Sequence, residues 1–300
     1  MSREYHAEQA SKARIIYAAS RTADMDAVDW HAAVAEARSA ISAALRASDY
    51  LRDVTGAIRD SGEHSRVIRH ILAPPLSQDQ FSLCYPGWSK SSEKQGGRRP
   101  SEATGVAVTK AVNERRWKAL TPWLETGRKP TRRELERVYW AIGTIIASQQ
   151  FATVQRNRAA HKQEQDVVAI LLRLGWTRMP SSLRDTRASL PERHFMHKTR
   201  FATENEPQEV DIALGLRGSV VLAMECKVTN DATNSVKRIN DVLKKATAWK
   251  SHWGSFVKPA ALLQGVIAER DVFRLLDANV EVFWSHDLMR FEQWLGDALG

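Results

Sequence analysis

Residues 209–228 have the alternation of a β-hairpin but carry charged side chains where a buried strand is normally apolar. The segment runs Glu209-Val-Asp-Ile-Ala-Leu, turns at Arg217-Gly-Ser, and continues Val220-Val-Leu-Ala-Met-Glu-Cys-Lys-Val228. Successive side chains of a strand point to opposite faces, so Glu225 and Lys227 share one face and Cys226 points to the other. Burying such charges is costly unless they are paired, so the pattern indicates a functional site.

The first strand of this hairpin adds a further carboxylate. The same alternation puts Val210 and Ile212 on one face and Asp211 on the opposite one. Hard cations such as Mg²⁺ prefer carboxylate and carbonyl oxygens. The hairpin therefore predicts a divalent metal held by Asp211 and Glu225, with Lys227 beside it.

The pattern Asp-(x)13-Glu-x-Lys across a hairpin resembles the PD-(D/E)XK nuclease superfamily, which includes most type II restriction endonucleases. The proline that usually precedes the aspartate is missing, because Val210 stands there. The resemblance implies Mg²⁺-dependent hydrolysis of DNA, with Mn²⁺ able to substitute. It also implies metal ligands at Asp211 and Glu225 and at the backbone carbonyl of Cys226. Lys227 would orient a metal-bound water or stabilise charge on the phosphorus.

A helix expected over residues 157–174, ended by Gly175, adds Glu164 to the candidate site. Steps of about 100° per residue place Glu164 within the apolar stripe of this helix. Two interpretations stay open: Glu164 reaches solvent at the helix end, or it reaches the metal site on the sheet. In the superfamily, the helix before the hairpin often supplies such a glutamate, so Glu164 is a candidate catalytic residue and metal ligand.

The order of the expected elements indicates the fold class. A strand over 194–202 precedes the hairpin, and a helix over 234–250, a strand over 260–267, a short helix through 276, a strand over 280–284 and a helix over 287–299 follow it. This order resembles the restriction-endonuclease-like αβββαβ core, an α/β (α+β) fold with a mixed sheet. We therefore expect a catalytic core over 151–300, preceded by a mostly helical N-terminal region over 1–150 that contains a basic loop at 84–100.

The charge of the chain indicates the class of partner. The 300 residues carry a net charge of +9, and residues 87–137 hold 13 Lys and Arg against 6 Asp and Glu. A basic surface of this kind is typical of a protein that binds a polyanion, although a solvated surface with a basic bias would look alike. Together with the nuclease motif, the charge favours double-stranded DNA.

Two segments supply candidate DNA contacts. Residues 76–100 form a polar, basic stretch with interleaved aromatic residues, which is either a recognition loop or a surface loop ordered by its aromatics. The start of the helix after the hairpin offers free backbone N–H groups that could bind a phosphate. The candidate DNA-binding residues are Lys90, Lys94, Arg98, Arg99, Asn234, Ser235, Lys237 and Arg238.

A narrower resemblance rests on three stretches, Leu76-Ser-Gln-Asp-Gln-Phe, Trp88-Ser-Lys-Ser-Ser-Glu-Lys and Glu225-Cys-Lys-Val-Thr-Asn-Asp-Ala-Thr-Asn-Ser-Val-Lys-Arg. They are similar to the XamI-type restriction endonucleases. This resemblance implies restriction-modification and phage defence, cleavage at a short palindrome, and a homodimer whose symmetry mirrors the site. Two alternatives remain: a repair or phage-defence nuclease of the same fold that recognises DNA structure or acts with partners, and a non-catalytic DNA-binding module.

Other classes of protein are disfavoured. No run approaches the roughly 20 apolar residues needed to span a bilayer. The two cysteines form neither a zinc pattern nor a disulfide framework, and no Gly-rich nucleotide loop is present. We therefore expect a cytoplasmic protein that uses no nucleotide cofactor and binds no membrane.

Overall fold

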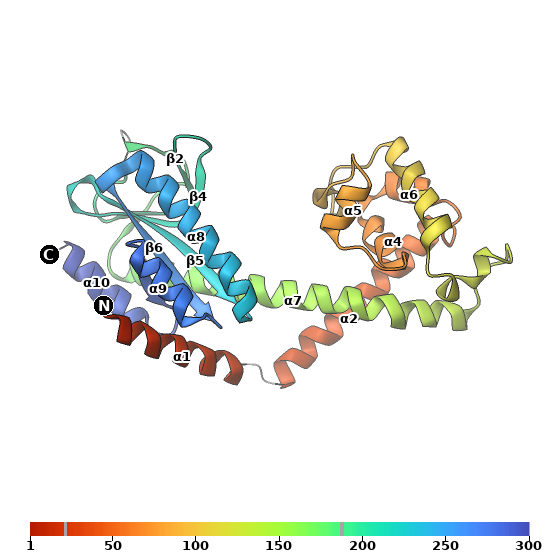
Figure 1. Ribbon diagram of the computed structural model, residues 1–300, viewed down its shortest axis with the longest axis horizontal. Helices are drawn as coiled ribbons and strands as arrows, with labels where there is room; N and C mark the ends of the chain where they lie inside the picture. Colours follow the sequence, from red (N-terminus) through yellow and green to blue (C-terminus); the bar gives the residue numbers. More distant parts are fainter. Residues whose placement is uncertain (21–22, 187–188, 300) are drawn as a thin grey trace. The chain divides into compact units, whose positions relative to one another are not determined.

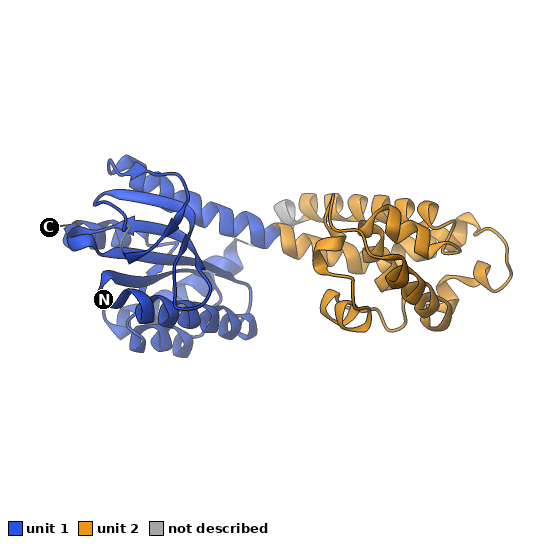
Figure 2. Ribbon diagram, turned by 90° about the horizontal axis from the view of Figure 1, so that it is seen from above, with its two compact units in different colours: residues 1–22, 155–300 blue, residues 23–154 orange. Residues whose placement is uncertain are grey.

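The computed structural model describes residues 1–20, 23–186 and 189–299, with only the backbone for residues 23–26. The chain forms two compact units (Figure 2): unit 1 comprises residues 1–22 and 155–300, and unit 2 comprises residues 23–154. The sequence grouped residues 1–150 together, but helix α1 (Arg3–Ala19) belongs to unit 1. Ala10 and Ala13 of α1 are buried in a hydrophobic cluster of that unit, which accounts for the difference.

Unit 2 is helical and has its own hydrophobic core, in which Ile41, Ile68 and Trp123 are fully buried. Within the described residues its helices are α2 (Ala23–Ala47), α3 (Val54–Asp60), α4 (Ser65–Ile71), α5 (Gln78–Cys84), α6 (Glu102–Arg115) and the first part of α7 (Arg132–Arg173). Short 3-10 helices lie at Gly62–His64, Lys90–Glu93, Lys118–Leu120 and Pro122–Leu124.

The aromatic residues of segment 76–100 order it from within. The ring of Phe81 packs against the rings of Tyr85 and Trp88, with centroid distances of 4.6 and 4.9 Å. The Trp88 indole N–H donates to Ser65 Oγ of α4 at 2.9 Å. The stretch therefore includes helix α5 and is anchored to the core of unit 2, although the sequence indicated a loop.

The helix expected over residues 157–174 is the C-terminal part of one longer helix, α7, which begins at Arg132. It begins with the capping box that Thr131 and Glu134 predict: each backbone amide donates to the other residue's side chain. Residues 151–156 contain neither glycine nor proline, so nothing in them stops the helix. Residues 132–154 of α7 lie in unit 2, and residues 155–173 lie in unit 1.

Unit 1 is built on a seven-stranded sheet in the order β1-β3-β4-β5-β6-β7, with β2 paired to β3. The strands are β1 (Thr177–Arg178), β2 (Leu183–Arg184), β3 (His194–Phe201), β4 (Gln208–Gly215), β5 (Val221–Thr229), β6 (Val257–Gly265) and β7 (Glu281–Trp284). Its later helices are α8 (Ala232–Trp253), α9 (Glu269–Asp277) and α10 (Leu288–Leu299). Strands β3, β4 and β5 are antiparallel, and β5, β6 and β7 are parallel, which confirms the expected α+β core with a mixed sheet.

Helices cover both faces of this sheet (Figure 1). On one face, Ile239 of α8 lies in a cluster with Leu263 of β6 and with residues of α1 and α9. On the other face, Leu171 of α7 and Phe291 of α10 lie in a cluster with Ile212 of β4. None of the described helices is long and apolar enough to cross a membrane.

Candidate active site

Asp211 lies where the pairing between β4 and β5 ends. The two strands are paired from Gly215–Val221 to Ile212–Met224, and Asp211 is the next residue of β4. The Cys226 backbone amide of β5 donates to Asp211 Oδ2 at 2.8 Å. The Asp211 side chain thus takes the place of a backbone acceptor of β4, and this hydrogen bond holds it at the opening between the strands.

The alternation expected around Asp211 is wrong at one position. Val210 should share a face with Ile212, but Val210 is buried in the cluster beneath α8, and Ile212 is buried in the cluster beneath α7 and α10. The cause lies opposite Asp211 on β3, where Lys198 has φ 56°, a left-handed conformation that is rare within strands. The regular β3–β4 register omits this pair of positions, so the alternation shifts there by one residue.

Glu225 is a fully buried carboxylate held by two lysines from different elements. Its Oε2 accepts from Lys227 Nζ of the same strand at 2.7 Å, and its Oε1 accepts from Lys245 Nζ of α8 at 2.8 Å. Burial raises the pKa of Glu225 above its usual value, although the Lys227 ammonium opposes that shift. The two lysines therefore compensate a negative charge that would otherwise be costly inside the protein.

Glu164 joins this site from α7. Its side chain is buried, its Oε1 accepts from Lys198 Nζ at 2.6 Å, and its Oε2 lies 2.8 Å from His197 Nε2. The same Lys198 Nζ donates to Asp211 Oδ1 at 2.7 Å. Of the two interpretations left open by the sequence, the structure has Glu164 beside Asp211 and not in solvent.

The Lys198 ammonium sets the electrostatics between these two carboxylates. Burial tends to raise the pKa of Asp211, but the hydrogen bonds from Lys198 and from the Cys226 amide bring it below its usual value. Burial tends to lower the pKa of Lys198, but the hydrogen bonds to Asp211 and Glu164 raise it overall. Both Asp211 and Lys198 are therefore charged at neutral pH.

The donor atoms of this site suit a hard divalent cation. Glu164, Asp211 and Glu225 offer carboxylate oxygens, and a backbone carbonyl at Cys226 could add another oxygen. The Cys226 thiol points into the core, and burial raises its pKa, so no soft sulfur ligand is presented. Among the described residues, no three His, Cys, Asp or Glu side chains are grouped closely enough to hold a metal without rearrangement, and ammonium groups bind the carboxylates instead.

Sequence reasoning misses three side chains of this site. One is His197: its spacing from His194 would put the two histidines on opposite faces of a strand, and His194 indeed lies elsewhere, 2.9 Å from the Glu192 carbonyl oxygen. Another is Lys245, a charged residue that a helical pattern would place on the polar face of α8, although the next residue, Ala246, is buried. Nothing in the local sequence marks Lys198, whose role depends on its left-handed backbone.

The start of α8 differs from the expected phosphate-binding helix end. Asp231 caps the helix and accepts hydrogen bonds from both the amide and the side chain of Asn234. Ser235 is fully buried and donates to an aspartate of α9. A carboxylate therefore already occupies the helix N-terminus, and Ser235 is not accessible to a phosphate, which corrects the expectation for that residue. Lys237 is exposed and Arg238 is half-buried.

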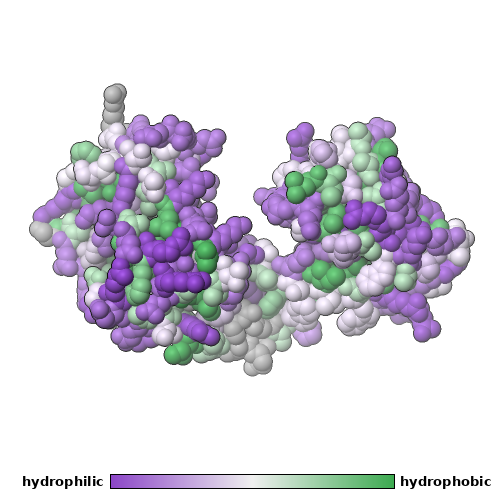
Figure 3. All heavy atoms as spheres, viewed as in Figure 1, coloured by the Kyte–Doolittle hydropathy of each residue, from purple (hydrophilic) through white to green (hydrophobic). Residues whose placement is uncertain are grey.

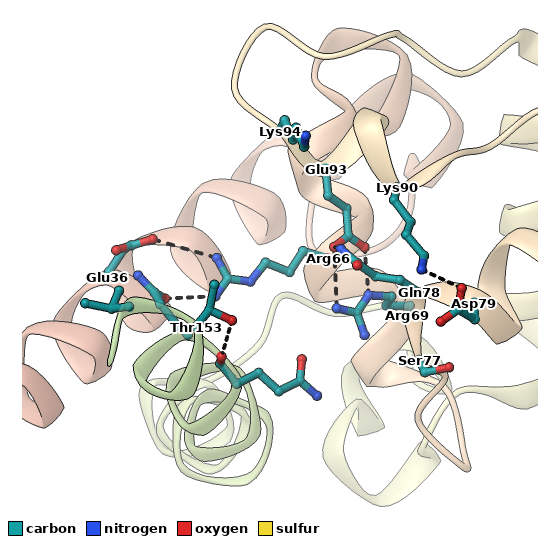
Figure 4. A pocket seen from close by; sticks show the side chains of 13 residues that line it. Glu36, Arg66, Arg69, Ser77, Gln78, Asp79, Lys90, Glu93, Lys94 and Thr153 are labelled. Atoms are coloured by element: carbon teal, nitrogen blue, oxygen red, sulfur yellow. Dashed lines mark hydrogen bonds and ion pairs between the residues drawn. The ribbon is translucent and has the colours of Figure 1, made fainter. Parts of the chain in front are cut away.

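The expected DNA contacts of unit 2 lie at its surface. Lys90 and Lys94 line a pocket of about 680 Å³ (Figure 4). Lys90, Lys94, Arg98 and Arg99 are all exposed, and Lys90 Nζ lies 2.6 Å from Asp79, so its charge is compensated by a neighbour. Hydrophilic residues predominate on the visible face of this unit (Figure 3), in keeping with a solvated, charged surface.

Comparison with known proteins identifies the family. Residues 49–284 match the family described as XamI restriction endonuclease. The type II restriction enzyme XamI of Xanthomonas campestris pv. amaranthicola is 30% identical over 193 residues, which are 63% of this chain and 67% of that enzyme. A solved structure, protein VC1899 from Vibrio cholerae, is 12% identical with a TM-score of 0.30, too low to establish a shared fold; the alignment covers 93% of this chain but only 58% of that one. On the match over residues 49–284, this chain belongs to the XamI restriction endonuclease family.

Proposed function

We propose that this protein is a type II restriction endonuclease that requires Mg²⁺ to hydrolyse phosphodiester bonds at a specific site in double-stranded DNA. Membership of the family implies site-specific DNA cleavage. The observation that supports the remainder is the convergence of three elements. Strands β4 and β5 and helix α7 bring Asp211, Glu225 and Glu164 to the opening between β4 and β5.

The roles of the residues follow from their contacts. When bound, Mg²⁺, or Mn²⁺ in its place, would polarise a phosphoryl oxygen and lower the pKa of a bound water. Asp211 and Glu225 would hold the ion, assisted by Glu164 and by the carbonyl of Cys226. Lys227 lies 2.7 Å from Glu225 and is almost fully buried, so its ammonium is positioned to orient the attacking water or to stabilise charge that develops on the phosphate. Lys245 would fix Glu225 from α8.

We further propose that unit 2 supplies most of the DNA contacts. Its exposed Lys94, Arg98 and Arg99 would neutralise phosphates or reach base edges, and Lys90, which lines the same pocket as Lys94, would add a further contact. Lys237 and Arg238 of α8 would contact phosphates in unit 1. A homodimer would present two active sites to a palindromic sequence, one for each strand.

Digestion of unmethylated phage DNA with Mg²⁺ tests the proposal, run beside EDTA, a Lys227→Ala variant and a Lys258→Ala control on the exposed side of β6. We expect discrete fragments with the wild type and Lys258→Ala, and no fragments with EDTA or Lys227→Ala. A smear in place of discrete fragments would favour a nuclease that recognises DNA structure. Salt-sensitive DNA binding without any cutting would instead favour a non-catalytic binding module.

A further inference from the structure

Lys198 has the contacts that a bound cation would make with Glu164 and Asp211. Its Nζ lies 2.6 Å from one carboxylate and 2.7 Å from the other, and the two come from different elements, α7 and β4. A hard divalent cation held between the two carboxylates would use the same two oxygens, because Glu164 Oε2 already contacts His197 and Asp211 Oδ2 already accepts from the Cys226 amide. Two positive groups cannot occupy this position together, so binding of the ion and the present contacts of Lys198 exclude one another.

The backbone shows that this arrangement is imposed on the strand. Lys198 has φ 56°, and a non-glycine residue with positive φ inside a strand is strained. The conformation interrupts the β3–β4 register opposite Asp211. Such strain persists only where surrounding contacts outweigh it, and the two ion pairs to Glu164 and Asp211 are among the contacts that hold this residue.

Lys198 differs from the two lysines that hold Glu225. Its side chain is 55% exposed, whereas those of Lys227 and Lys245 are 10% and 19% exposed. An exposed ammonium can move into solvent or toward a phosphate, and the buried pair at Glu225 cannot do so as freely. Lys198 is therefore the lysine of this site that can leave without opening the core.

We propose that Lys198 is an internal competitor for the divalent cation: its ammonium neutralises Glu164 and Asp211 in the metal-free protein and is displaced when the ion binds. The proposal rests on the proposed function, because it takes Asp211 as a metal ligand. Because the ion must first displace the ammonium, the apparent affinity of the protein for the ion is lowered. Only the fraction of molecules with Lys198 withdrawn is competent to bind the ion. Lys198 would thus keep the carboxylates in place while the metal is absent.

Titration calorimetry with Mg²⁺ or Ca²⁺ alone, without DNA, measures this competition directly. We expect Lys198→Met to bind the ion at least roughly tenfold more tightly than the wild type, because it loses charge-assisted hydrogen bonds that the ion must break. Lys198→Gly should do the same, and glycine adopts positive φ without strain, so this variant protects the test against misfolding. The matched control is Lys258→Met, whose ammonium lies over the Trp294 ring. It should bind like the wild type.

A second readout is thermal stability. In EDTA, Lys198→Met should melt below the wild type, because Glu164 and Asp211 then lose the ammonium that they share. Adding Mg²⁺ should raise the Tm of this variant more than that of the wild type.

Three results would overturn the competitor role. Unchanged or weaker ion binding by both Lys198 variants, beside a wild type whose binding is lost in Asp211→Asn, would reject the competitor and leave the metal site standing. An equal Mg²⁺-dependent rise in Tm in wild type and Lys198→Met would reject it likewise. Absence of ion binding in the wild type and both variants would reject the competitor together with the metal-binding part of the proposed function.

Discussion

The charged side chains that we propose to act in units 1 and 2 have opposite surroundings. In unit 1, Glu225 is buried and bound by lysines from β5 and α8, and Glu164 is bound by a lysine that also holds Asp211. In unit 2, Arg98 and Arg99 lie in solvent. Chemistry at one phosphate requires charges in fixed places, which burial and shared partners provide. Attraction of a long polyanion requires only net charge at the surface, which needs no such fixing.

The sharpest test of this contrast is Asp211→Asn. Removing a proposed metal ligand should lower the cleavage rate by about 10³-fold or more while DNA binding is retained, because an ion that stabilises the transition state contributes several kcal/mol. The measurement is single-turnover cleavage of phage DNA with Mg²⁺.

The control for that experiment is Asp166→Asn, on the outer side of α7, where the carboxylate pairs with Lys162. This variant should cleave at the wild-type rate. If Asp211→Asn cleaved DNA at the wild-type rate, the proposed catalytic site in unit 1 would be rejected.

In one respect the two units should behave alike, because each contains a buried histidine that burial keeps neutral. The pKa of His6 in unit 1 and that of His70 in unit 2 are each lowered from 6.5 to about 4. Each histidine takes up a proton near pH 6.5 in the unfolded chain, but only near pH 4 in the folded chain. Its contribution to the free energy of unfolding is therefore fully present above pH 6.5 and is lost as the pH falls from 6.5 toward 4. The loss is up to about 3 kcal/mol for each histidine.

Urea unfolding at pH 7.5 and pH 4.5 measures this loss. His70→Gln should lose less stability between the two values than the wild type, although its stability at pH 7.5 can be lower. Equal losses in both proteins would show that His70 is not a source of acid sensitivity.

A smaller effect should follow from Lys245→Met, which removes one of the two partners of buried Glu225. We expect the free energy of unfolding to fall by about 2 kcal/mol, less than for a carboxylate left with no partner, because Lys227 remains. The adjacent Lys244→Met is the control, since Lys244 is exposed, and its effect should stay within about 0.5 kcal/mol. Equal stability of the two variants would mean that Glu225 does not need α8.

The smallest effect concerns the surface of unit 2. Replacing both Arg98 and Arg99 by alanine should reduce the slope of log Kobs against log salt by about 1.8, because each lost phosphate contact removes about 0.9. Lys90→Ala should change it less, since Asp79 already compensates that charge. A slope that does not respond to the double substitution would move DNA binding away from this segment.

The sequence predicts those parts of unit 1 that depend on local pattern. Alternation in β4 and β5 and helical spacing in α7, together with the resemblance to the nuclease superfamily, selected Asp211, Glu225 and Glu164. In the structure Lys198 joins Glu164 to Asp211, whereas Glu225 is bound separately by Lys227 and Lys245. Both patterns depend only on residues two to four positions apart, so they can be recognised in the sequence. The continuity of α7 was missed because the weakly apolar residues 151–156 gave no positive signal for a helix.

Features that depend on tertiary contacts could not be predicted in this way. The positive φ of Lys198 interrupts the regular alternation of β3 and β4. Val210 therefore lies on the face opposite to the one that alternation predicts. Ser235 looked like a helix-end residue open to solvent, but α9 packs over it and accepts its hydroxyl hydrogen bond. Both features depend on contacts with other elements: Lys198 contacts α7 and β4, and Ser235 contacts α9.

The buried thiol of Cys226 has a practical consequence. The sequence contains one other cysteine, Cys84, which is exposed on α5, whereas burial raises the pKa of Cys226 well above the usual value. Thiolates, not thiols, react with maleimides, so a fluorescent maleimide should attach to Cys84 and spare the strand that carries the carboxylates. A dye can therefore be attached at one cysteine of this sequence, in the unit proposed to supply most of the DNA contacts, without any engineered residue.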